Sequence, residues 1–424
     1  MMFPEKVNTV VVGGGQAGLA MSEHLVASQV SHVVLERHRI AERWRSERWD
    51  SLVANGPAWH DRFPTKEFQS CGPDDFPTKH EVVRYFEDFA TEIDSPIHCG
   101  VEVQQISRQR GRTGFVVTTS HGQILADNVV AATGPFQRPL IPDLVPQSTG
   151  VMQMHSSGYR NPDQLPEGAV MVVGAGSSGA QIADELTRAG RQVYLSVGPH
   201  DRPPRAYRGR DYCWWLGVLG KWDAAAKEPG TEHVTISVSG AHGGSTIDFR
   251  RFAERGVILT GRTQGYEDGR LLFAGDVADN VQRGDANYLS VLREADAYAL
   301  RHGLNLPEER EAHDIIDEPS CMREPLRSLD LAASGVGSII WATGFAADYS
   351  WIKADIFDEQ GRPVHQRGVT SEVGLYFLGL PWQSRRGSAF IWGVWHDAKY
   401  LADQIGIQRA YRAYHEEIEQ RDVS

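Results

Sequence analysis

Two glycine-rich segments of this chain carry the residue types that bind the pyrophosphate of a dinucleotide. Residues 13–18 read GGGQAG and residues 174–179 read GAGSSG. In such a turn the first glycine bends the chain, the second lets the backbone approach the phosphate, and the third lets a helix pack on a strand. The helix start supplies N–H donors and the positive end of its dipole. The predicted phosphate-binding residues are Gly13, Gly15, Gln16, Ala17 and Gly18 in the first segment, and Gly174, Gly176, Ser177, Ser178 and Gly179 in the second.

The first segment is followed by an acid at the position that holds the ribose hydroxyls. Glu36 ends a second strand-like stretch, and Arg37 follows it. A lone glycine motif is weak evidence, but here the strand, helix, second strand and acid all agree. A glycine turn without a ligand leaves Glu36 unexplained. We therefore predict an FAD site that includes Glu36 and Arg37.

The second segment lacks that acid. At the same spacing it leads to Val197, which Ser196 precedes, and Arg202 and Arg205 follow. Loss of the carboxylate beside arginines is what a 2′-phosphate requires. We therefore predict NADPH, in preference to NADH, held in part by Ser196, Arg202 and Arg205. The alternative is that these arginines belong to a solvated loop.

The elements around each glycine turn form a strand–helix–strand unit. The first unit comprises strand 7–12, helix 16–28 and strand 32–36; the second comprises strand 169–173, a helix through 182–186, and strand 192–197. Apolar spacing supports both helices. Two copies of one unit are typical of an α/β protein with two dinucleotide-binding, Rossmann-like domains.

The order of the segments predicts that one domain is inserted into the other. A proline-rich stretch follows Ala132-Thr133-Gly134, and a similar strand ending recurs at Ala342-Thr343-Gly344. We predict an FAD-binding domain built from residues 1–145 and 326–424. The NADPH-binding domain, residues 146–325, is inserted between these two parts.

Composition and charge exclude several function classes. The chain has 424 residues and a formal net charge of −12, which argues against nucleic acid as the main ligand. No apolar run of about 18 residues predicts a membrane helix, and the N-terminus does not resemble a signal peptide. The four cysteines are widely spaced and predict neither a metal site nor a thiol redox pair. We expect a cytoplasmic protein with reduced thiols.

The chain resembles the flavin-containing monooxygenase superfamily (class B flavoprotein monooxygenases), specifically its CzcO-like bacterial branch. The resemblance covers nearly the whole chain. Beyond the two glycine turns it rests on residues 45–55 (RSERWDSLVAN), 132–135 (ATGP), 155–159 (HSSGY), 207–211 (YRGRD) and 341–345 (WATGF). It implies that NADPH reduces FAD, that a C4a-(hydro)peroxyflavin forms with molecular oxygen, and that one oxygen atom is inserted into a small organic substrate.

The resemblance also implies roles for individual residues. Asn55 matches a family asparagine beside the flavin and the nicotinamide, where it is the catalytic candidate; the plain alternative is a turn residue before Gly56-Pro57. His155 is expected to organise the hinge between the domains. The further residues expected to bind the cofactors are Trp44, Arg45, Trp49, Leu52, Ser388 and Ala389, at FAD, and Thr133, Gly134, Thr343 and Gly344. For the tryptophans, ordinary core packing is the alternative.

Several functions stay open on the residues alone. Oxygenation at a heteroatom is favoured over Baeyer–Villiger oxygenation of a ketone, because Tyr159 stands where the main ketone-oxygenating type has tryptophan. A disulfide reductase of the same architecture needs a cysteine pair near the flavin. A flavin redox sensor linked to transport is a third alternative. The substrate is not identified, and a homodimer is left open.

Overall fold

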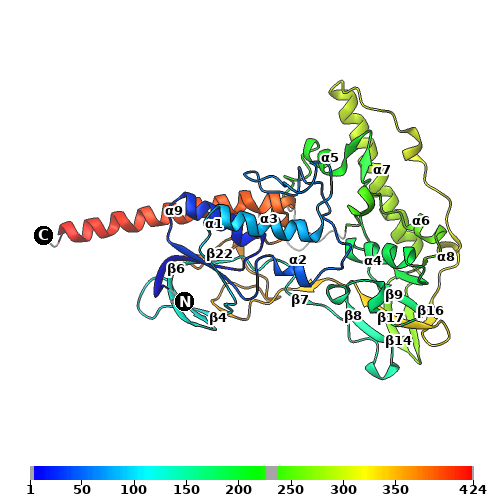
Figure 1. Ribbon diagram of the computed structural model, residues 1–424, viewed down its shortest axis with the longest axis horizontal. Coiled ribbons are helices and arrows are strands. Elements are labelled where there is room, and N and C mark those ends of the chain that lie inside the picture. Colours follow the sequence, from blue (N-terminus) through cyan, green and yellow to red (C-terminus); the bar gives the residue numbers. More distant parts are fainter. Residues whose placement is uncertain (1–3, 226–235, 423–424) are drawn as a thin grey trace.

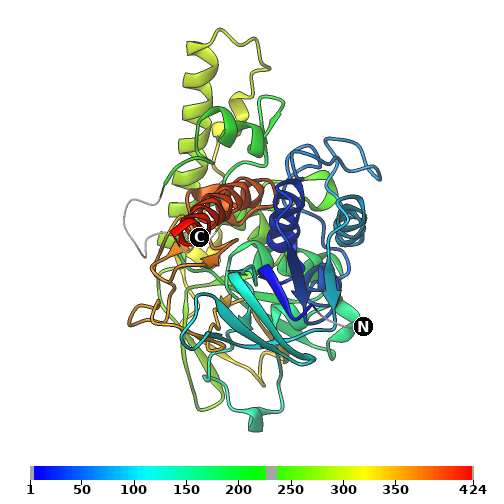
Figure 2. The same cartoon turned by 90° about the vertical axis from the view of Figure 1, so that its left-hand side faces the viewer.

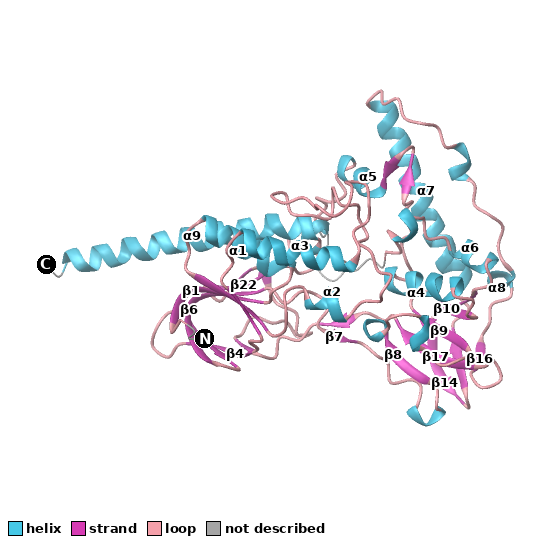
Figure 3. Ribbon diagram, in the orientation of Figure 1, coloured by secondary structure: helices cyan, strands magenta, loops and turns pink. Residues whose placement is uncertain are grey.

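One mixed and one parallel β-sheet, each covered by helices, form the two halves of the molecule (Figures 1 and 3). The computed structural model describes residues 4–225 and 236–422. Each predicted glycine turn lies at the carboxyl end of a buried central strand, β1 or β9. The predicted α/β class with two Rossmann-like units is confirmed.

The first sheet carries the first glycine turn. Its strands follow the order β19-β4-β5-β6-β1-β2-β3, and β22 pairs in parallel with β6 and also joins β21, which joins β20. β1 pairs in parallel with both β2 and β6, so their carboxyl ends meet at one edge. The bounds are β1 Lys6–Val12, β2 His32–Glu36, β3 Ile97–Cys99, β4 Val103–Arg108, β5 Phe115–Thr119, β6 Gly122–Ala131, β19 Ile352–Lys353, β20 His365–Gln366, β21 Val369–Thr370 and β22 Leu375–Phe377.

The second sheet is parallel throughout, with the order β13-β10-β9-β17-β8. Its strands are short and rich in buried β-branched residues, as expected for a sheet with both faces covered. The bounds are β8 Met152–His155, β9 Ala169–Val173, β10 Val193–Ser196, β13 Ile258–Thr260 and β17 Val336–Trp341. Beside it lie two antiparallel groups: β11 Ala206–Tyr207 with β12 Arg210–Asp211, and β14 Thr263–Glu267 with β15 Arg270–Phe273 and β16 Ser328–Asp330.

The chain crosses between the two units twice, and the two crossings pair with each other. β7 (Arg138–Pro139) runs antiparallel to β18 (Phe345–Ala346). The predicted return to the first unit at residue 326 differs from the structure. Both β16 and β17 follow that residue, yet β16 pairs with β15 and β17 lies between β9 and β8. The chain therefore returns only after Trp341.

The helices differ in how they begin. α3, α5 and α6 start at side-chain caps supplied by Thr78, Asp211 and Asp248. α1 and α4 start at Gly15 and Gly176, with no side-chain cap. The first N–H groups of a helix lack partners within the helix, so a start without a side-chain cap has donors that suit an anion. The bounds are α1 Gln16–Ala27, α2 Glu42–Ser46, α3 Lys79–Glu92, α4 Ser177–Arg188, α5 Tyr212–Val218, α6 Phe249–Glu254, α7 Val277–Arg301, α8 Ser320–Arg323 and α9 Ile391–Asp422.

The last helix closes the first unit. α9 lies along α1 over the first sheet, and its far turns extend away from the body (Figures 1 and 2). Leu19 and Leu25 of α1 share a buried apolar cluster with Val394 and Leu401 of α9. This packing brings the start of α9 close to the first glycine turn.

Candidate functional site

The three glycines of the first turn lie in the surroundings that a pyrophosphate site needs. A Cβ atom on Gly13 would lie 2.6 Å from the carbonyl oxygen of Ala132, and one on Gly18 would lie 1.8 Å from that of Gly13. Gly13 also has a φ of +115°. By contrast, a Cβ on Gly15 would meet nothing within 4 Å. The turn therefore leaves no room for a side chain at Gly13 or Gly18 but faces open space at Gly15. This open side lies at a helix start without a side-chain cap, an arrangement that fits a phosphate group.

Glu36 lies at the end of β2 beside this turn. Its two carboxylate oxygens accept hydrogen bonds from the backbone N–H groups of Gly14, at 2.7 Å, and His38, at 2.8 Å. The carboxylate is thus held over the glycine turn, in the place where ribose hydroxyls are bound in this fold. The neighbouring Arg37 is exposed.

The two sequence-distant parts of the predicted FAD site meet at the start of α9. Gln16 donates its side-chain amide to the carbonyl of Ala389 at 2.7 Å. Ser388 is buried, and its hydroxyl accepts from the backbone N–H groups of Ser384 and Arg385. Thr133 and Gly134, at the end of β6, both accept from the side chain of Gln137.

The segment between α2 and Asn55 connects the two units. Trp49 and Leu52 are buried in the core of the second unit, and Trp44 packs against both cores. Arg45 pairs with Glu87 of α3. These contacts are the core packing named above as the plain alternative; the contact with FAD stays a prediction.

Asn55 lies where this segment meets α4. Its side-chain oxygen Oδ1 accepts from Nε2 of Gln181, a residue of α4, at 2.9 Å. Its backbone carbonyl accepts from Arg205. Gln181 was not among the predicted site residues. The only signal for it was its position one turn after Ser177 on the helix of the second glycine turn.

The second glycine turn repeats the packing of the first. A Cβ on Gly174 would lie 2.5 Å from the carbonyl oxygen of Ala342, and one on Gly179 would lie 1.8 Å from that of Gly174. One difference concerns the helix start. The backbone N–H and the hydroxyl of Ser177 both donate to the carbonyl of Ile236, at 2.9 and 2.8 Å. A group of the protein therefore partly occupies the start of α4.

The two arginines of the predicted 2′-phosphate clamp are paired with carboxylates of the protein, so the structure gives that prediction no support. Arg202 is buried and donates twice to Asp285 of α7. Arg205 is buried and pairs with Asp211. Both guanidinium groups are committed to carboxylates, since a buried charge needs a partner. Sequence proximity to Val197 did not indicate the direction in which these side chains point.

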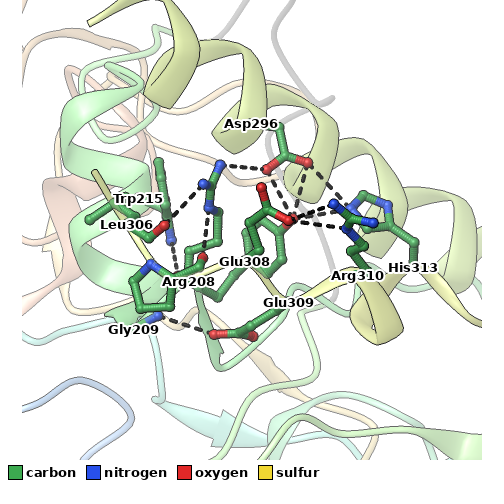
Figure 4. A network of polar contacts seen from close by, with 11 residues as sticks. Arg208, Gly209, Trp215, Asp296, Leu306, Glu308, Glu309, Arg310 and His313 are labelled. Carbon is green, nitrogen blue, oxygen red and sulfur yellow. Dashed lines mark hydrogen bonds and ion pairs between the residues drawn. The ribbon is translucent and has the colours of Figure 1, made fainter. Parts of the chain in front are cut away.

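Ser196 and the nearby Arg208 also bind other groups of the protein. Ser196 is buried, donates to the carbonyl of Gly261 and accepts from the N–H of Thr263. Arg208 pairs with Asp296 of α7 and donates to the carbonyls of Leu306 and Pro307 (Figure 4). Both side chains are thus engaged by groups of the protein.

An arginine from the neighbouring strand lies where the clamp was expected. Arg262 follows β13, and a Cβ on Gly198, just past β10, would lie 3.4 Å from Cγ of Arg262. The side chain is 61% exposed and pairs with Asp276. No local sequence signal connects Arg262 with β10, because the two are adjacent only through the sheet.

His155 contacts the second of the two crossings between the units. Its Nε2 atom lies 2.9 Å from the carbonyl oxygen of Gly344, and its ring meets Phe345 edge to face. Burial lowers the pKa of His155, so the neutral ring is favoured. Thr343 donates its hydroxyl to the carbonyl of Leu140 in the other crossing.

A cavity of about 660 Å³ opens beside Gln181. One wall is formed by Trp49, Ser51 and Val53 of the segment after α2, and the others by α4, residues 239–248 and α6. Its charged side chains are largely paired, as where Asp184 contacts Arg188 and Arg255.

Within the residues that the structure describes, no helix has the length and apolar character needed to span a membrane.

Comparison with known proteins places the chain among flavin-dependent oxidoreductases. A family model described as pyridine nucleotide-disulphide oxidoreductase matches residues 10–208. A CzcO-like oxidoreductase of Geobacillus kaustophilus is 37% identical, over 94% of this chain and 98% of its own length. The indole-3-pyruvate monooxygenase YUCCA1 of Oryza sativa is 32% identical, over 94% of this chain and 91% of its own.

A solved structure shows the same fold over the whole chain. The flavin-containing monooxygenase from Stenotrophomonas maltophilia superposes with a TM-score of 0.64 at 21% identity. The match covers 95% of this chain and 99% of that one.

Proposed function

Since this chain belongs to the CzcO-like branch of the flavin-containing monooxygenase superfamily, we propose that it is an NADPH-dependent FAD monooxygenase acting on a small organic substrate. The proposed reaction consumes the substrate, O₂, NADPH and a proton, and yields the oxygenated product, water and NADP⁺. When bound, FAD supplies the redox chemistry that couples NADPH to oxygen.

The observation that carries the proposal is the pair of glycine turns without side-chain caps, together with Asn55, which contacts the helix of the second turn. The residues that would hold FAD are those of the first turn, Glu36, and the start of α9. The first turn fits this group because Gly15 opens onto free space while Gly13 and Gly18 admit no side chain. The helix start supplies the N–H donors for its pyrophosphate.

The second turn would hold NADPH, with two differences from the sequence prediction. We assign the 2′-phosphate to Arg262 instead of Arg202 and Arg205, because Arg262 is exposed and lies beside Gly198. Guanidinium groups suit phosphate oxygens. The Ile236 carbonyl must leave Ser177 before that N–H can bind a phosphate.

Asn55 is the proposed catalytic residue. A side-chain amide offers both a donor and an acceptor, and the Asn55 oxygen is already bound to Gln181. Its amide N–H group therefore remains as the donor toward the reacting centre. Exclusion of water there prevents loss of reducing equivalents to side reactions.

Oxygen transfer to a heteroatom is the favoured chemistry, with ketone oxygenation as the alternative. Tyr159 is buried, donates to Glu185, and has its pKa raised by burial. Its hydroxyl is thus occupied within the second unit, which gives no support for a role at a carbonyl.

The test uses the purified protein loaded with FAD, supplied with NADPH and ¹⁸O₂. A panel of thioethers and amines is compared with a panel of ketones. We expect ¹⁸O in the product of at least one heteroatom substrate. Recovery of all NADPH electrons as hydrogen peroxide with every substrate would overturn the proposal.

A further inference from the structure

Gln181 connects the helix of the second glycine turn with Asn55. Its Nε2 atom lies 2.9 Å from Oδ1 of Asn55 and 2.7 Å from the backbone carbonyl oxygen of Val238. The residue is buried. It lies one helical turn after Ser177. The hydroxyl of Ser177 donates to the carbonyl of Ile236, two residues before Val238.

These two contacts determine the orientation of both amides. Oxygen and nitrogen of a side-chain amide have similar shapes, and the hydrogen-bond network decides between them. A backbone carbonyl only accepts, so the Gln181 atom facing Val238 must be the NH₂ group. That same group also faces Asn55, so the Asn55 atom there must be its oxygen. The Asn55 NH₂ group consequently points away from Gln181.

The backbone around Asn55 is held by other residues. Its carbonyl accepts from Arg205, which Asp211 fixes in turn. The next N–H group, that of Gly56, donates to Asp61 at 2.8 Å. These two contacts hold the peptide group after Asn55, and the N–H of Ala54 donates to the carbonyl of Pro77 before it. The remaining freedom is therefore the rotation of the Asn55 side chain. Gln181 makes the contact that selects one of its two amide orientations.

We propose that Gln181 is a positioning residue that turns the amide N–H of Asn55 toward the reacting centre. The catalytic consequence of this orientation rests on the proposed function, whereas the orientation itself does not. Because Gln181 belongs to α4, the helix that carries the second nucleotide turn also orients the catalytic amide. The predicted link runs from α4 through Gln181 to Asn55.

Gln181→Glu tests the link with a change of one group at nearly constant shape. A carboxylate only accepts, so it cannot donate to Oδ1 of Asn55, and Asn55 is expected to turn its NH₂ group toward Glu. We expect product formed per NADPH to fall at least about fivefold, toward the value of Asn55→Ala, with flavin reduction by NADPH little changed. Arg188→Gln, on the same face of α4, is the matched control and should keep wild-type coupling.

Two further readouts separate positioning from a general structural role. Lower pH should restore coupling in Gln181→Glu, since a protonated carboxyl group regains a donor. The double variant with Asn55→Ala should be no more uncoupled than Asn55→Ala alone, because both changes remove one interaction. Wild-type coupling in Gln181→Glu, or additive losses in the double variant, would overturn the proposal.

A measurement without turnover keeps this inference distinct from the proposed function. In protein labelled with ¹⁵N-asparagine, the side-chain signals lost in Asn55→Ala identify the Asn55 amide. Gln181→Glu should shift these signals downfield and slow their exchange with water, while Arg188→Gln leaves them in place. Unchanged signals in Gln181→Glu would overturn the positioning role, even if the protein oxygenates its substrate. Shifted signals in a protein that only releases peroxide would support positioning and overturn the function.

Discussion

The side-chain amide of Gln16 donates to the backbone carbonyl of Ala389 at 2.7 Å, although 373 positions separate them in sequence. This contact joins the first helix to the segment that leads into the last one. The α1–α9 packing supports it over several turns. Residues expected to contact the same cofactor from opposite ends of the chain are thereby brought together.

Gly15→Ala and Gly18→Ala should separate nucleotide binding from folding. Gly15 has a φ of −93° and open space above it, so alanine fits the apo protein but intrudes on a phosphate. We expect FAD affinity to fall at least about tenfold, which is about 1.4 kcal/mol, with the apo melting temperature unchanged. Gly18→Ala overlaps the Gly13 carbonyl and should destabilise the apo protein by about 2 kcal/mol or more. Calorimetry of binding and of unfolding measures both; equal FAD affinity in Gly15→Ala and wild type would contradict the assignment.

Asn55→Ala should retain FAD but lose coupling. The variant lacks the amide donor and leaves Gln181 with Val238 as its partner. Loss of one positioned donor typically costs about 10² in rate, so most electrons from NADPH should appear as hydrogen peroxide. Peroxide release per NADPH, measured with and without substrate, is the readout. Unchanged coupling would remove Asn55 from the catalytic site.

Arg262→Ala and Arg202→Met should have opposite signatures. Arg262 is exposed near the end of β10, so its loss should raise KM for NADPH about tenfold with little effect on KM for NADH. Arg202→Met leaves the buried Asp285 with Arg250 as its one remaining ion-pair partner among the described residues, and should cost about 2 to 4 kcal/mol of stability without changing the NADPH to NADH ratio. Steady-state kinetics with both nucleotides and denaturant unfolding test the pair. A selective NADPH defect in Arg202→Met would reinstate the original clamp.

Stability should fall as pH drops below about 6.5, in part through His32. The Val30 carbonyl fixes the proton on Nδ1, so Nε2 accepts from Ser22 in the neutral ring. Burial lowers the pKa of His32. The unfolded chain therefore binds the proton more readily, and the stabilisation present above pH 6.5 is lost on acidification.

The measurement is the melting temperature between pH 8 and pH 5.5. His32→Gln should show a shallower decline than wild type, whereas His80→Gln, at an exposed site, should keep the wild-type slope. A His32→Gln profile parallel to that of wild type would exclude His32 as a contributor.

The features that the sequence predicted well are those whose chemistry is local. Gly13, Gly15 and Gly18 lie within six residues, and the strand before them and the helix after them follow from apolar spacing. Glu36 was singled out because it ends the next strand of the same unit, and the structure holds it beside the glycine turn; its contact with FAD stays a prediction. The missing side chains identify the three glycines, and the carboxylate identifies Glu36.

The features that the sequence missed depend on tertiary neighbours. Arg202 lies close to the expected phosphate site in sequence, but Asp285 on α7 captures it. Arg262 reaches β10 only because β13 is its neighbour in the sheet. The return of the chain was placed too early because β17 pairs within the second sheet, and pairing partners of a parallel strand are remote in sequence.

In the proposed second nucleotide site, the backbone carbonyl of Ile236 competes with the nucleotide for a hydrogen-bond donor. It accepts a hydrogen bond from the same N–H group of Ser177 that we propose as a donor to the phosphate. The observed affinity for the nucleotide then equals the intrinsic affinity scaled by the fraction of molecules in which this contact is open. Because Ile236 belongs to the same chain as Ser177, the effective concentration of its carbonyl is high and does not vary with dilution. Occupancy of the proposed second site therefore depends on the backbone of the chain and not only on the residues that touch the ligand.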